Sequence, residues 1–213
     1  MKPRPNRKRG QVHLSPLAST ITRSISSRYL HGKAMLTLRC TEKLLKRLKQ
    51  PLTIQPVTSP NPLGEWYAAI DSYDREPFVL LLNAQTGITL VLPARAKHLK
   101  EINFYAAVQL ALLFEHYGVQ SPLADAELLA WQQPLQFAKT QSPSLLASMN
   151  RLRDDTWHNF EHHDHTYNEN AAKHWRGMFK KPGATKAPKW TEPLENLYMC
   201  LGLEKPARQA TWT

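Results

Sequence analysis

The sequence predicts an α+β fold, a small antiparallel sheet arranged as a meander and packed by three to four helices. Two observations lead to this prediction. An apolar run at Phe78–Leu82 is followed, after a five-residue turn ending in Gly87, by a second run at Ile88–Leu92, as in a buried hairpin. After Pro93 the apolar spacing changes to that of helices.

The first elements lie before this hairpin. Met35–Arg39 alternates apolar and polar residues, which indicates a short strand and a possible fourth member of the sheet. Thr41 is a suitable cap for a helix over Glu42–Lys49, which has leucines on one face and lysines and arginine on the other. Residues 51–63 are rich in Pro, Thr and Ser and indicate a surface connection.

The remaining elements follow in order. Glu65–Ile70 alternates in the manner of a strand and completes a three-stranded antiparallel meander. Helices are expected over Lys97–Tyr117, from Ser121-Pro122 to Trp131, and from Ser142-Pro143 to about His162, because serine followed by proline is typical of a helix start. Leu135–Lys139 is a possible further strand.

These elements place the α+β domain at residues 35–165. Residues 166–213 are polar, aromatic and interrupted by proline, and we expect a basic, largely irregular tail with helix only at Pro193–Leu201.

Positive charge is concentrated before the domain. The chain has a formal net charge of +11, and residues 1–34 carry eight basic residues and no acid. We expect this leader to be disordered. It could precede the true start at Met35, form an arm that neutralises phosphates, or be an organellar transit peptide.

Composition excludes several classes of protein. The two cysteines form no disulfide framework and fit a reducing compartment, so we expect a cytoplasmic protein. No apolar run approaches the length of a membrane span, and we expect no membrane partner.

Three segments resemble an uncharacterised bacterial domain family. They are an opening Leu-Arg-Cys-Thr-Glu-Lys-Leu-Leu at Leu38–Leu45, Leu63–Ala68, and Ser144–Asn150. The resemblance covers about residues 35–160. It implies a domain boundary at Met35 and a bacterial origin, but no activity. Such small domains often accompany phage defence systems or toxin–antitoxin pairs, which gives only a context.

A histidine-rich segment is a candidate metal site. If the helix continues to residue 165, Asp154, His158, His162 and His165 lie along one stripe. Imidazole and carboxylate ligands suit divalent transition metals, yet the segment lacks a recognised motif. The alternative interpretation is a polar helix end whose histidines face water.

The tail is a candidate nucleic-acid site. It interleaves cations with aromatic rings, a combination that single-stranded nucleic acid requires for its phosphates and its bases. The candidate residues are Lys173, Trp175, Arg176, Lys180, Lys181 and Trp190. The alternative is a solvated tail with a few docked aromatics.

The sequence therefore favours a non-enzymatic intracellular interaction protein without a cofactor. Its partner would be nucleic acid or an acidic protein, in a phage-defence or toxin–antitoxin setting. The alternative function is a metal-dependent hydrolase or nuclease that uses the stripe at Asp154–His165.

Overall fold

The structure, a computed structural model, describes residues 36–54, 59–180 and 190–205. The predicted leader at residues 1–34 lies outside this part of the chain. The described residues form a five-stranded sheet with the order β4-β3-β2-β1-β5 and a separate two-stranded sheet. The main sheet consists of β1 (Thr37–Cys40), β2 (Trp66–Tyr73), β3 (Glu76–Asn83), β4 (Thr89–Pro93) and β5 (Gln136–Lys139).

The predicted meander is present as strands β2, β3 and β4. Each pairs antiparallel with the next, with Leu80 opposite Ala69 on one side and Val91 on the other. Every residue from Phe78 to Asn83 is buried. A strand that is covered on both faces consists of consecutive apolar residues. The apolar run at Phe78–Leu82 therefore marks an interior strand of the sheet.

The sheet is larger and more mixed than predicted. β1 pairs parallel with β2 and also parallel with β5, so only the meander is antiparallel. The α+β class is confirmed, and both optional strands belong to the sheet. Their direction could not be predicted, because a four-residue strand carries no signal of the strand it will pair with.

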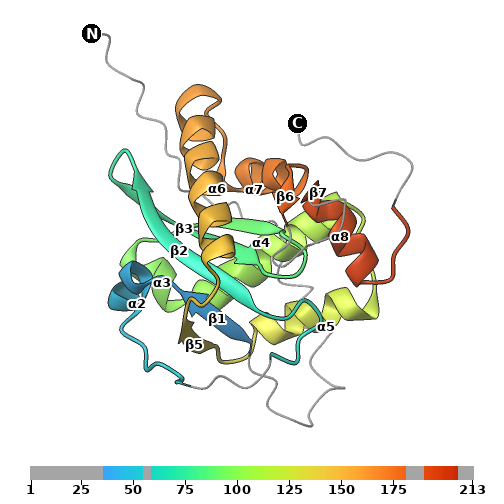
Figure 1. Cartoon of the computed structure of the whole chain (residues 1–213), viewed down its shortest axis with the longest axis horizontal. Coiled ribbons are helices and arrows are strands. Elements are labelled where there is room, and N and C mark those ends of the chain that lie inside the picture. Colours follow the sequence, from blue (N-terminus) through green and yellow to red (C-terminus); the bar gives the residue numbers. More distant parts are fainter. Residues whose placement is uncertain (1–35, 55–58, 181–189, 206–213) are drawn as a thin grey trace. The chain divides into compact units, whose positions relative to one another are not determined.

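Seven helices occur within the described residues, more than the sequence predicted. α4 and α5 lie behind the sheet in Figure 1, and α6 crosses in front of it. The predicted helix over Lys97–Tyr117 is two helices, because Glu101 leaves helical geometry with φ −120°. The helices are α2 (Glu42–Leu48), α3 (Ala96–Lys100), α4 (Ile102–His116), α5 (Pro122–Trp131), α6 (Pro143–His162), α7 (Tyr167–Trp175) and α8 (Pro193–Cys200).

The described part of the predicted irregular tail is folded onto the domain, which corrects the boundary at residue 165. α7 contacts β4, α4, α6 and α8. After it, β6 (Phe179–Lys180) pairs antiparallel with β7 (Trp190–Thr191). The buried side chains of Phe179, Leu194 and Leu197 belong to the main hydrophobic core.

None of the helices in the described residues is long and apolar enough to cross a membrane.

Candidate nucleic-acid interface

The β6–β7 hairpin is formed by Phe179–Lys180 and Trp190–Thr191. It packs on the main sheet through a contact between the Phe179 ring and Gly87. A Cβ atom on Gly87 would lie 2.3 Å from Cγ of Phe179, and Gly87 adopts φ +83°. Only glycine combines this positive φ with so close an approach. Gly87 therefore serves two purposes: it closes the turn between β3 and β4, and it leaves space for the Phe179 ring.

Polar contacts from α8 fix one side of the hairpin. The Nδ2 atom of Asn196, on α8, donates to the carbonyl of Thr86 at 2.9 Å and to Oγ1 of Thr191 at 2.8 Å. The helix that precedes the hairpin, α7, begins with a capping box in which the side chains of Thr166 and Glu169 accept hydrogen bonds from each other's backbone amides. The hairpin thus follows α7 and precedes α8 in the chain, and α8 contacts it directly.

Trp190 is the exposed ring of this hairpin. Its side chain is 46% exposed, and the guanidinium of Arg151, on α6, lies 5.3 Å from the ring centroid. The Arg151 guanidinium also donates to the carbonyl of Met178. A cation over an indole ring is attractive, so Arg151 fixes one face of Trp190 in place.

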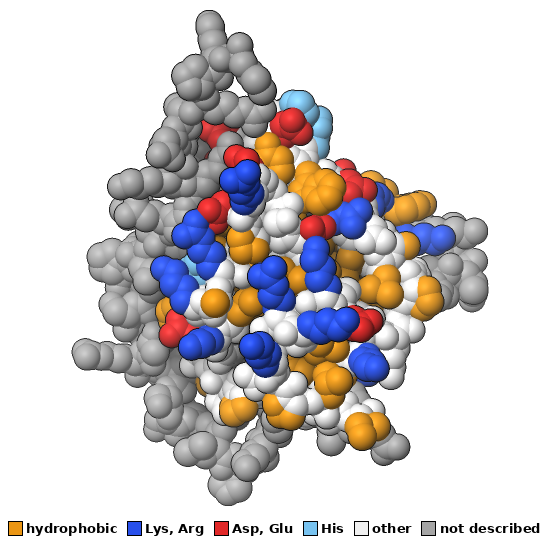
Figure 2. Space-filling model, turned by 90° about the vertical axis from the view of Figure 1, so that its left-hand side faces the viewer, with side chains coloured by type: hydrophobic (Ala, Val, Ile, Leu, Met, Phe, Trp, Pro, Cys, Tyr) orange, Lys and Arg blue, Asp and Glu red, His pale blue; other side chains and the backbone are white. Residues whose placement is uncertain are grey.

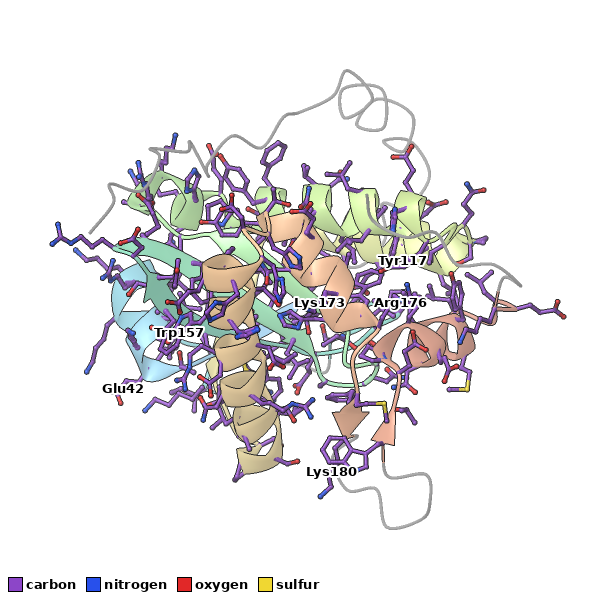
Figure 3. The ribbon with its side chains drawn as sticks, turned by 90° about the horizontal axis from the view of Figure 1, so that it is seen from above. Glu42, Tyr117, Trp157, Lys173, Arg176 and Lys180 are labelled. Atoms are coloured by element: carbon purple, nitrogen blue, oxygen red, sulfur yellow. The ribbon has the colours of Figure 1, made fainter. Side chains whose placement is uncertain are left out.

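An exposed cation lies directly beside this ring. Lys180 is the cross-strand partner of Trp190, and Figure 3 shows it at the outer end of the hairpin, on the same side of the molecule as α6. Lys180 and Arg176 form no ion pair within the described residues. Lys173 is also exposed, but its Nζ donates to Oδ1 of Asn159 at 2.7 Å. The predicted contributor Lys181 lies outside the described residues.

The structure corrects the role predicted for Trp175. This side chain is 0% exposed, stacks on Tyr117 with ring centroids 5.5 Å apart, and donates from Nε1 to the carbonyl of Thr89 at 2.8 Å. A ring without an exposed face cannot stack on a base. Trp175 instead belongs to the core.

Trp175 also helps to close the edge of the sheet at β4. The side-chain amide of Gln109 accepts from the Val91 N–H at 2.8 Å and donates to the Val91 carbonyl at 2.9 Å. Trp175 satisfies the Thr89 carbonyl, and Pro93 has no N–H to offer. Side chains thus occupy hydrogen-bonding groups that an open edge would present to another chain.

A second basic surface lies on α2 and α3, and Figure 2 shows Lys and Arg side chains spread over that side of the molecule. The two helices contact each other. Part of their charge is neutralised internally: Lys46 pairs with Glu42 at 2.9 Å, Lys43 with Asp71 at 3.3 Å, and Arg95 with Glu76. The exposed cations of this α2–α3 face are Lys43, Lys46, Arg47, Lys49, Arg95, Lys97 and Lys100.

The predicted metal stripe is not assembled. α6 ends at His162, so His165 does not continue the helical face that carries Asp154 and His158. His158 and His162 have ring centroids 4.5 Å apart, but the carboxylate of Asp154 pairs with Arg153 at 2.9 Å. No group of three or more His, Cys, Asp or Glu side chains in the described part of the chain is placed to hold a metal ion.

Cys40 and the Trp66–Tyr67 pair belong to the core. Cys40 is buried, and this burial raises the pKa of its thiol, which opposes formation of a nucleophilic thiolate. Trp66 and Tyr67 are also buried. Among the tryptophans of the described residues, Trp190 therefore combines a large exposed area with an adjacent cation, Lys180, that forms no ion pair within the described part.

A family model described as a domain of unknown function, DUF6933, matches residues 37–196. The chain belongs to the DUF6933 family. The match begins at β1 and ends within α8, so the β6–β7 hairpin and Trp190 are part of the DUF6933 domain. The predicted resemblance to an uncharacterised domain family is confirmed, and the matched region extends beyond residue 160. Comparisons with curated proteins and with solved structures found no match.

Proposed function

We propose that this DUF6933 protein binds single-stranded nucleic acid through the β6–β7 hairpin, without catalysing a reaction. The observation that carries the proposal is the Trp190 ring, which is 46% exposed and supported from one side by Arg151. Stacking of a base on an aromatic ring contributes about 1–3 kcal/mol. A ring already held by a guanidinium loses little conformational freedom when a base stacks on it.

The charge around Trp190 supports the same function. Residues 176–191 contain five cations and no acid, and those that are described, Arg176 and Lys180, form no ion pair within the described part. Free cations can neutralise phosphates and release the counterions condensed on the strand. Ring and charge together match the two requirements of single-strand binding.

The test is a titration of a fluorescently labelled single-stranded oligonucleotide with the full chain, followed by anisotropy. Trp190→Ala should weaken binding by about 1–3 kcal/mol per stacked base and leave the dependence on salt unchanged, because no phosphate contact is lost.

The matched control is Phe104→Ala. Phe104 is also 46% exposed, but it lies in the first turn of α4, and its ring makes an edge contact with the Tyr105 ring rather than with a cation. This variant should bind like the wild type. Absence of binding at low salt would refute the proposal and make an acidic protein the better partner. A loss in Phe104→Ala alone would move the site to the start of α4.

A further inference from the structure

A pocket of about 150 Å³ opens beside Trp190, between α6, the end of α7 and the β6–β7 hairpin. Arg151 lines this pocket and also contacts the Trp190 ring, so the two features share one side chain. The lining residues are Gly87, Arg151, Leu152, Asp155, His174, Gly177, Met178, Phe179 and Pro193.

Two charged side chains of the pocket, Arg151 and Asp155, do not form an ion pair with each other. Arg151 and Asp155 are one turn apart on α6, the spacing of a helical ion pair. However, Arg151 donates to the carbonyl of Met178 and stacks on Trp190. Asp155 is left with no ion pair or hydrogen bond within the described residues. The pocket therefore presents a free acceptor beside a cation that has N–H groups to spare.

The other side chains that line the pocket carry no charge. His174 is buried, and Nε2 of its ring lies 2.8 Å from Oγ1 of Thr156. Leu152, Phe179 and Pro193 supply apolar surface. A cavity of about 150 Å³ holds a single six-membered ring such as benzene. The space thus suits a one-ring base rather than a purine.

We propose that this pocket receives a cytosine base of the bound strand, with Asp155 accepting a hydrogen bond from the exocyclic amino group. This inference rests on the proposed function and gives it a sequence preference. Carboxylates accept from the N4 amino group of cytosine, whereas thymine and uracil offer a carbonyl oxygen at that position. The Asp155 carboxylate would repel that oxygen and leave both groups unsatisfied.

The experiment compares the binding of labelled oligo(dC) and oligo(dT) to the full chain, at a slightly alkaline pH that keeps cytosine unprotonated. The wild type should prefer oligo(dC) by about tenfold, within the range of one good base contact. Asp155→Ala should abolish this preference.

Asp154→Ala is the matched control. Asp154 is the adjacent exposed acid of α6 and pairs with Arg153, and it does not line the pocket. Both variants remove one negative charge and should strengthen binding of oligo(dT), which makes no hydrogen bond to Asp155, to a similar extent. Only Asp155→Ala should lose the preference, which a merely structural or electrostatic role would not alter.

The outcomes separate the two proposals. Equal binding of oligo(dC) and oligo(dT) by the wild type, or a preference that survives in Asp155→Ala, overturns the cytosine pocket and leaves the proposed function standing. If neither strand binds at low salt, the proposed function fails and the pocket inference fails with it.

Discussion

The β6–β7 hairpin and the α2–α3 face are both basic, but they differ in what accompanies the charge. On the α2–α3 face, Lys43, Lys46 and Arg95 are paired with acids of the same domain. At the hairpin, Lys180 forms no ion pair within the described part, and its cross-strand neighbour is the ring supported by Arg151, which also lines a pocket. Charge alone therefore does not identify a nucleic-acid site; groups that can hold a base distinguish the two surfaces.

The largest expected effect tests whether the hairpin is an integral part of the fold. Phe179→Ala removes the ring that packs on Gly87 and should lower the free energy of unfolding by roughly 3–5 kcal/mol, as measured by urea denaturation. Met178→Ala is the control, because Met178 is the adjacent side chain and is 55% exposed. Its effect should stay within about 0.5 kcal/mol. Equal stability of the two variants would show that the hairpin is not anchored in this way.

The next effect is the loss of stability at low pH that the buried His174, in the wall of the pocket, should cause. Burial lowers the pKa of His174 from its ordinary value of 6.5 to about 3. The unfolded chain takes up a proton below pH 6.5, but the folded chain does not. The stability that this histidine contributes is therefore complete above pH 6.5 and is lost as the pH falls towards 3.

This loss should amount to roughly 4 kcal/mol of the free energy of unfolding across that range, because each unit of pKa difference corresponds to about 1.4 kcal/mol. Denaturation of His174→Gln at several pH values should show a correspondingly weaker dependence on acid. His162→Gln changes an exposed imidazole and should behave like the wild type. The same pH dependence in all three proteins would contradict the assignment of a buried neutral His174.

The smallest effect compares the two basic surfaces directly. Lys180→Ala should reduce the slope of log affinity against log salt by about 1, as expected for the loss of one phosphate contact. Lys97→Ala, on the α2–α3 face, should leave this slope unchanged. Titrations at several salt concentrations give both slopes. A reduction in Lys97→Ala without one in Lys180→Ala would place the strand on α2 and α3.

The centre of the sheet could be predicted from the sequence because its signal is local. The apolar run at Phe78–Leu82 and the turn at Gly87 belong to one hairpin, so neighbouring residues define it. The parallel pairing of β1 with β5 joins Leu38 to Phe137. A contact between such distant short strands leaves no periodic pattern in either.

The tail was misinterpreted for a different reason. Its many cations and prolines favoured an irregular tail, although two signals of a helix are present. Thr166 and Glu169 have the spacing of a capping box, and Ala171 and Trp175 lie one turn apart on one face. Recognition of that face would have placed Trp175 in the core. The supporting contact of Arg151 with Trp190 could not be predicted, because it depends on how α6 packs beside the hairpin.

The central claim is that a strand contacts the hairpin rather than the α2–α3 face, and the indole N–H signals in a nitrogen–proton NMR spectrum test it most directly. The chain has six tryptophans, and the signal missing from Trp190→Ala identifies Trp190. Addition of a single-stranded oligonucleotide should shift this signal, while those of the buried Trp66, Trp131 and Trp175 remain in place. An unmoved Trp190 signal, together with shifts of the backbone amides of α2 and α3, would contradict the account.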